Sequence, residues 1–403
     1  MSDTDHGTVP GAPGRDDFDP LSPEVLADPH AMYRDLRARC PVAHSRSFGG
    51  FWALTRYEDV EWAVTNPQLF TSRFGIVVPR NPASGRRPPL HHDPPEHTTY
   101  RRAMNPVFRK DRLARLEPVM AATVAELVAD AVLAGRACGF DDLASPLAAR
   151  TLSALLNVPA ELSADVSRHA AAFERAQFAF DAAQVEEENR VLYDLARRIV
   201  IERRRRPLDP AEDLVSALFD LEVGGERIDD EVVAGSLRQV LVAGHGAPAL
   251  VMANGLVHLA RDRALQDRLR ADVSLVPAAV EELLRLHTPN QGFARTVVAE
   301  VEVGGETLAP GELVTVSYTA ANRDPAVFDD PDELRLGRGG HHLAFGHGTH
   351  VCPGSHPGRR QMQLLIERVL AATSSFELTG DLEWAPFPVH GPTRAPLALH
   401  TAS

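Results

Sequence analysis

A glycine-rich segment that ends on a cysteine constrains this chain more than any other feature. It reads Phe345-Gly346-His347-Gly348-Thr349-His350-Val351-Cys352-Pro353-Gly354, and a helical stretch follows it from Gly358 to Thr373. Glycines let a loop lie close against a flat ligand, and the free N–H groups at the start of a helix stabilise a thiolate. The segment therefore predicts that Cys352 ligates a metal ion such as iron.

Zinc is the alternative metal, because several histidines crowd the same cysteine: His341, His342, His347, His350 and His356. Zinc sites usually show paired ligands at a short, regular spacing, and no C-x-x-C pair accompanies this cluster. The other two cysteines, Cys40 and Cys138, stand far away in the chain and are interpreted as small buried hydrophobic residues. The pattern favours iron.

The segment around Cys352 resembles the haem-binding signature of the cytochrome P450 family, Phe-Gly-x-Gly-x-His/Arg-x-Cys-x-Gly, and matches it at every defined position. The resemblance extends over roughly residues 20 to 400. It implies haem b (iron protoporphyrin IX) bound through Cys352, with Phe345 and Gly346 beside the cofactor. It also implies a mainly α (α+β) fold, in which a triangular helical domain carries a smaller β-rich part. The haem is then expected between a long central helix and the cysteine loop.

Burying the two propionates of a haem requires cationic donors. His97 and Arg101 lie four residues apart, hence on one face of a helix, and resemble the family's His-x-x-x-Arg element. The resemblance adds Arg295 and His350 to the set. Each of the four taken singly reads as an ordinary surface cation, but together they are predicted to bind the haem.

Glu282 and Arg285 form an i, i+3 pair, which is common on helix surfaces and means little alone. The pair lies before the cysteine loop and resembles the family's Glu-x-x-Arg element. In the family it bonds to a further arginine, which by position is Arg338. We predict that this triad is structural and holds the cysteine loop in place.

A long apolar helix is predicted to begin after Asp229 or Asp230 and to run to about Asp262. The family's central helix reads Ala-Gly-x-Asp/Glu-Thr, and its acid and alcohol relay catalytic protons. Here the run is Ala243-Gly244-His245-Gly246-Ala247-Pro248, so neither Gly246 nor Ala247 offers an acid or a hydroxyl. Pro248 and the glycines should still distort the helix. His245 is a further candidate for proton transfer, at a position that varies in the family.

Three functions remain open at this point. The first is a monooxygenase that acts on a small, mostly apolar molecule of the secondary-metabolite kind. The second is dioxygen-independent chemistry, driven by peroxide or by a substrate with an already oxidised N–O bond, and the third is a non-catalytic haem sensor. By resemblance the substrate pocket is lined by Phe74, Ile76, Val77, Val240, Ala243, Gly244, Ala247, Asn290, Gln291 and Phe293, although core packing explains each of these equally well.

The net charge of -13 argues against general binding of nucleic acids, which needs a basic surface. Electron delivery by a ferredoxin and a ferredoxin reductase is expected at a local basic patch, formed by Arg101, Arg102, Arg109, Lys110, Arg112, Arg359 and Arg360. With few cysteines, no signal-peptide pattern and no apolar run of about 18 residues, we expect a cytoplasmic protein that does not enter a membrane. Residues 1–20 are expected to be a disordered leader before a single domain at residues 21–403.

Overall fold

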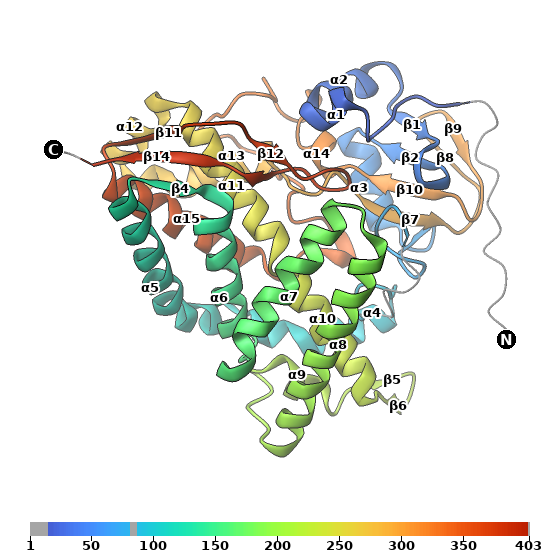
Figure 1. Cartoon of the computed structure of the whole chain (residues 1–403). Helices are drawn as coiled ribbons and strands as arrows, with labels where there is room; N and C mark the ends of the chain where they lie inside the picture. Colours follow the sequence, from blue (N-terminus) through green and yellow to red (C-terminus); the bar gives the residue numbers. More distant parts are fainter. Residues whose placement is uncertain (1–14, 81–86, 402–403) are drawn as a thin grey trace.

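The computed structural model describes residues 15–80 and 87–401 and shows a mainly helical protein with a smaller β part, as predicted (Figure 1). The helices are α1 Pro23–Ala27, α2 Pro29–Arg39, α3 Tyr57–Thr65, α4 Glu96–Met104, α5 Lys110–Ala134, α6 Ser145–Leu155, α7 Ala160–Phe178, α8 Ala182–Arg205, α9 Leu214–Leu218, α10 Asp230–Ala243, α11 Gly246–Arg261, α12 Arg263–Ala271, α13 Val276–Leu286, α14 Tyr318–Ala321 and α15 Ser355–Ala372.

The strands are short and fall into one larger sheet and several small ones. They are β1 Val42–Ser45, β2 Phe51–Leu54, β3 Phe70–Thr71, β4 Arg136–Cys138, β5 Glu222–Val223, β6 Glu226–Arg227, β7 Phe293–Val297, β8 Val301–Val303, β9 Glu306–Leu308, β10 Leu313–Val316, β11 Ser375–Leu378, β12 Glu383–Trp384, β13 Pro392–Arg394 and β14 Pro396–His400.

The largest sheet has the strand order β1-β2-β10-β7-β3 and lies at one end of the molecule, beside α2 and α3 (Figure 1). Its strands pair antiparallel except β2 and β10, which are parallel with Val314 opposite Trp52. Trp52, Val314 and Val316 are buried on its core side with side chains of α3. This packing fixes α3 and β7, which both contribute to the candidate site.

Two large hydrophobic cores hold the helical part together, beside a smaller cluster between α7 and α8. Residues of α11, α13 and α15 share one core with the C-terminal half of α5. Residues of α8, α9 and α10 share the other with the N-terminal half of α5. The central helix crosses from one core to the other, and α11 lies in the middle of the helical part (Figure 1).

The long central helix is not continuous, because it breaks at Gly244 and His245 into α10 and α11. Pro248 has no N–H to donate to the carbonyl one turn before it. At the break the N–H of His245 donates to Val242 O at 3.1 Å, a tighter turn than an α-helix makes. The predicted distortion is therefore confirmed. Residues 230–261 are long and apolar enough to cross a membrane, but most of their apolar part is buried by other elements, as in the core helix of a soluble protein.

The predicted disordered leader is wrong for residues 15–20. The Phe18 ring is 8% exposed and packs edge-on against Phe51, with ring centroids 5.7 Å apart. The N–H of Asp17 donates to His44 O at 2.7 Å, so this segment is tied to β1. A buried aromatic ring offsets the polar composition on which the prediction rested. Residues 1–14 lie outside the described residues.

Candidate functional site

The loop that carries Cys352 is closed by its own backbone. The N–H of Cys352 donates to Phe345 O at 2.8 Å, and the N–H of Gly346 donates to Leu343 O at 2.9 Å. Gly346 and Gly348 have φ angles of 71° and 66°, a conformation that favours glycine. A Cβ on Gly348 would lie 2.8 Å from Val64 O, so this glycine also lets the loop approach α3.

The Cys352 thiol lies immediately before α15. Burial raises the pKa of this thiol, and the N–H of Gly354 together with the guanidinium groups of Arg101 and Arg359 lowers it. The same donors would stabilise a thiolate. Arg359 also lies over the Phe345 ring, 4.5 Å from its centroid, and so ties α15 to the start of the loop.

Four cationic side chains, predicted from the sequence as haem contacts, come together beside this loop. The rings of His97 on α4 and His350 before Cys352 lie 4.3 Å apart, and Arg101 donates to the carbonyl of Val351. Arg295 on β7 is 4% exposed. Among the described residues, the buried Nδ1 atom of His97 has no hydrogen-bond partner.

Burial is the main cause that lowers the pKa values of the two histidines in this group, and the neighbouring arginines lower them further. Burial, followed by the charge of Arg101, lowers the pKa of His97 to about 4. Burial, followed by Arg295 and His97, lowers the pKa of His350 to about 2. Asp93 opposes the effect at His97, but its carboxylate already accepts from Ser72 Oγ at 3.0 Å. The cluster therefore suits an anionic ligand.

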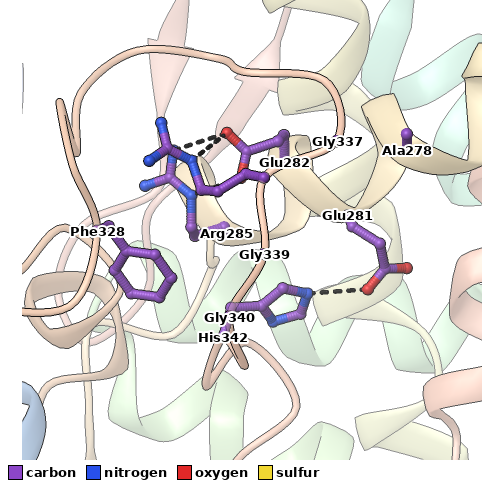
Figure 2. A pocket seen from close by; sticks show the side chains of 10 residues that line it. Ala278, Glu281, Glu282, Arg285, Phe328, Gly337, Gly339, Gly340 and His342 are labelled. Atoms are coloured by element: carbon purple, nitrogen blue, oxygen red, sulfur yellow. Dashed lines mark hydrogen bonds and ion pairs between the residues drawn. The ribbon is translucent and has the colours of Figure 1, made fainter.

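Glu282, Arg285 and Arg338 lie together in a buried ion-paired group. Arg285 Nε lies 2.7 Å from Glu282 Oε1, and Arg338 Nε lies 2.9 Å from Glu282 Oε2. Figure 2 shows Glu282 and Arg285 facing one another on α13, beside a pocket of about 260 Å³. The same view shows Glu281 bonded to His342, at 3.1 Å. These contacts tie α13 to the segment that leads into the cysteine loop.

The histidines near Cys352 point to different partners. His342 bonds to Glu281, while the Nε2 atom of His350 lies 3.2 Å from Ser72 Oγ. Within residues 15–80 and 87–401, no group of three or more His, Cys, Asp or Glu side chains is arranged to hold a metal ion. The zinc alternative therefore gains no support from the geometry.

One face of the central helix is accessible although the rest of the helix is largely buried. Ala243 is exposed, and Val240, Gly244 and Ala247 are half-buried. These positions lie on both sides of the break at Gly244 and His245, and together they form a short accessible face around it. His245 and Gly246 are buried beside this face. The four residues of the accessible face carry no polar side chain, and all four are pocket residues predicted from the sequence.

The remaining pocket candidates are placed less uniformly. Ile76, Val77, Asn290 and Phe293 are buried or half-buried near β7, and the backbone carbonyl of Ile76 accepts from Ala294 N at 2.8 Å. Phe74 is 56% exposed. Gln291 accepts a hydrogen bond from the Tyr33 hydroxyl at 3.2 Å and donates one to Val389 O at 2.8 Å. Its side-chain amide therefore links α2 to the segment around Val389. The assignment of Phe74 and Gln291 to the pocket stays a prediction.

Two side chains that the sequence did not single out lie against the break in the central helix. Glu174 on α7 places Oε2 3.0 Å from His245 Nδ1, and Ser145 on α6 places Oγ 3.3 Å from His245 Nε2. Glu174 lies in an ordinary amphipathic helix more than 70 residues before Gly246. The one signal in the sequence was Gly246 itself, because a glycine where the family has an acid leaves room for a side chain from another element.

The basic patch predicted for a ferredoxin is only partly at the surface. Arg112 is 6% exposed, and its guanidinium donates to backbone carbonyls of α6, so its assignment to a docking surface was wrong. Arg360 is paired with Glu117 and Arg359 with Glu281. Arg102, Arg109 and Lys110 are exposed, and they form the reduced patch.

Comparison with known proteins identifies the family. A sequence model described as Cytochrome P450 matches residues 183–381. Cyclomarin C epoxidase of Salinispora arenicola is 31% identical over 362 residues, which cover 87% of this chain and 90% of that protein. The steroid C26-monooxygenase of Mycolicibacterium smegmatis is 32% identical over 409 residues and 96% of both chains. The chain belongs to the cytochrome P450 family.

The fold agrees with this membership. A solved cytochrome P450 of Chondromyces apiculatus superposes with a TM-score of 0.85 at 29% identity, over 96% of this chain and 99% of that structure. The chain is therefore an enzyme of the cytochrome P450 type. Haem is the cofactor that the family implies, and His97, Arg101, Arg295 and His350 lie beside the Cys352 loop that would hold it.

Proposed function

We propose that this cytochrome P450 is a haem b monooxygenase that oxygenates a small, mostly apolar molecule of the secondary-metabolite kind. The cluster of His97, Arg101, Arg295 and His350 beside the Cys352 thiol carries the proposal, because the two guanidinium groups and the two histidine rings lie together and would bind two propionates. A haem bound through a thiolate supplies chemistry that favours cleavage of the O–O bond.

The substrate class rests on the accessible face of the central helix. Val240, Ala243, Gly244 and Ala247 offer neither charge nor a side-chain hydrogen bond, so an apolar part of the substrate would lie against them. The two relatives reported above are named as an epoxidase of cyclomarin C and as a C26-monooxygenase of steroids. The apolar face is compatible with either kind of reaction.

Spectroscopy of the purified protein tests the proposal. We expect one haem b per chain and, after reduction under carbon monoxide, the red-shifted Soret band that thiolate ligation produces. Cys352→Ser should lose this band, whereas Cys40→Ser and Cys138→Ser should keep it. A protein that contains zinc and no haem, or that shows an unshifted band in its native state, is incompatible with the proposal.

Dioxygen-independent chemistry is the second candidate, and the empty positions Gly246 and Ala247 favour it. A peroxide, or a substrate with an N–O bond, would remove the need to protonate and cleave dioxygen. Turnover measured with and without oxygen separates the two candidates.

We place the reaction in the cytoplasm, with electrons supplied by a ferredoxin and its reductase.

A further inference from the structure

Three hydrogen-bonded side chains connect α6 to α7 past the break in the central helix. Ser145 Oγ lies 3.3 Å from His245 Nε2, and His245 Nδ1 lies 3.0 Å from Glu174 Oε2. His245 and Glu174 are 2% and 6% exposed. Ser145 begins α6 and is half-buried, so it retains contact with solvent. The connection therefore leads from the surface to a buried carboxylate.

The carboxylate of Glu174 occupies the space that a side chain at position 246 would fill. A Cβ built on Gly246 would lie 2.0 Å from Glu174 Oε1 and 2.5 Å from its Cδ. No other residue at position 246 fits unless Glu174 moves. The absence of a side chain at Gly246 thus makes room for the Glu174 carboxylate. An acid from α7 therefore lies where the central helix itself carries none.

The three groups can pass a proton without a net change in charge along the path. A hydroxyl and an imidazole each accept a proton on one side and donate one on the other, and a carboxylate holds a proton as the acid. A proton from solvent would enter at Ser145, and His245 would take it at Nε2 and release one from Nδ1 to Glu174. The step breaks and forms only O–H and N–H bonds.

We propose that Glu174, reloaded through His245 and Ser145, supplies the catalytic protons beside Gly246. The proposal rests on the proposed monooxygenase function, because cleavage of dioxygen needs protons delivered at the site. A purely structural role is the alternative, in which the pair merely ties α7 to the start of α11. The two roles differ in one respect: a glutamine could still accept the hydrogen bond from His245, but it could not hold the proton.

The fate of dioxygen tests the proton supply and needs no known substrate. With electrons from a ferredoxin and its reductase, dioxygen leaves either as hydrogen peroxide, after taking up two electrons and two protons, or as two water molecules, after taking up four of each. Cleavage to water needs the additional protons at the site, so a poor proton supply there shifts the products towards peroxide. We expect Glu174→Gln to lower the rate of water formation by roughly 10²-fold, the lower end for a positioned proton donor, and to raise the share of peroxide. The matched control is Glu188→Gln, which changes a buried glutamate 2.6 Å from His169, away from Gly246.

Moving the acid back onto the central helix provides the rescue. Glu174→Ala should release mostly peroxide, and Glu174→Ala combined with Gly246→Glu should return to the wild-type ratio of water to peroxide. Gly246→Glu alone should lower the yield of haem protein, since its side chain collides with Glu174. A wild-type enzyme that releases all of its dioxygen as peroxide, or a Glu174→Gln enzyme that matches wild type, overturns the proposal.

Nuclear magnetic resonance of protein labelled with ¹⁵N-histidine measures the path independently of turnover. We expect the ring N–H of His245 to exchange with D₂O, and Ser145→Ala to slow this exchange because a methyl group relays no proton. An unchanged exchange rate removes the entry point and refutes the path. Absence of haem from the native protein would instead refute the proposed function, and the exchange measurement would still report on these three residues.

Discussion

Two buried arginines of this cytochrome P450 show that a charge in the core is either paired or costly. Arg285 is 1% exposed, and its guanidinium donates hydrogen bonds to Glu282 and to backbone carbonyls. Arg238 on α10 is 0% exposed, and none of its guanidinium nitrogens has a hydrogen-bond partner among the described residues. It lies over the ring of Phe173, 4.6 Å from the centroid. Their substitutions should have opposite effects.

Removing Glu282 should destabilise the protein strongly. The Glu282→Ala change leaves Arg285 and Arg338 as buried, unpaired charges, a loss of about 3–5 kcal/mol in the free energy of unfolding. Chemical unfolding and the yield of haem protein measure the effect. The control is Asp165→Ala, which removes an exposed i, i+3 pair with Arg168 and should cost no more than about 1 kcal/mol. Equal effects in the two variants would show that the buried group contributes nothing special.

Replacing Arg238 should stabilise the protein. Burial, followed by the charge of Arg87, lowers the pKa of Arg238 to about 9, so the group is charged at neutral pH and is held without an anion. Arg238→Met keeps much of the volume, retains contact with Phe173 and removes the charge, for a gain of about 1–4 kcal/mol. A melting temperature below that of the wild type would contradict this reading.

At the scale of elements, the sequence predicted what periodicity and short motifs encode. The long apolar helix that begins near Asp230, and the helical stretch that follows Cys352, both lie where their patterns placed them. Glu174 could not be found in this way, because its role depends on how α7 crosses the central helix. The burial of Arg112 and the hydrogen bonds of Gln291 likewise arise from tertiary contacts that no local pattern contains.

The cysteine loop offers a prediction about close packing between elements. Gly348→Ala combines a positive φ with a Cβ 2.8 Å from Val64 O, so the loop must move away from α3 and the haem content should fall. Gly135→Ala is the matched control, because Gly135 has a φ of 69° but nothing within 4 Å of its Cβ. It should cost stability without loss of haem. Equal haem occupancy in both variants would rule out the contact with Val64 as a constraint.

At the scale of the whole molecule, buried histidines predict sensitivity to acid. Burial lowers the pKa of His390 to about 4, and it lowers the pKa of His30 and His287 in the same region. Such groups take up protons mainly in the unfolded state, so stability is complete above about pH 6.5 and falls as the pH drops towards 4. One group contributes up to about 3 kcal/mol of this loss.

The His390→Phe variant tests this reading. Its ring can still stack on Trp384, as His390 does with centroids 4.7 Å apart, but it cannot take up a proton on unfolding. The free energy of unfolding in urea should fall less between pH 7 and pH 5 than it does in the wild type. The same pH dependence in both proteins would assign the acid sensitivity to other groups.

Electron delivery is the other property of the whole surface. Reversal of charge at Arg102 and Lys110 should slow reduction by a ferredoxin at low salt, and the difference should shrink as salt screens the contact. The same reversal at Glu126 and Arg150, an exposed pair on α5 and α6, leaves the net charge unchanged and serves as the control. A reduction rate that stays unchanged when the charges of Arg102 and Lys110 are reversed would place the docking surface elsewhere.

The break at Gly244 and His245 also determines which part of the molecule can move relative to the rest. The side chains of α10 pack with α8 and α9, and those of α11 pack with α13 and α15, so the break coincides with the boundary between the two cores. A continuous helix would couple the two cores, so that neither could move without the other. Here we expect α8, α9 and α10 to rotate together about a hinge at the break, while the core that contains α11, α13 and α15 and holds Cys352 stays rigid. The rotation would widen the space beside Ala243 for a bulky substrate.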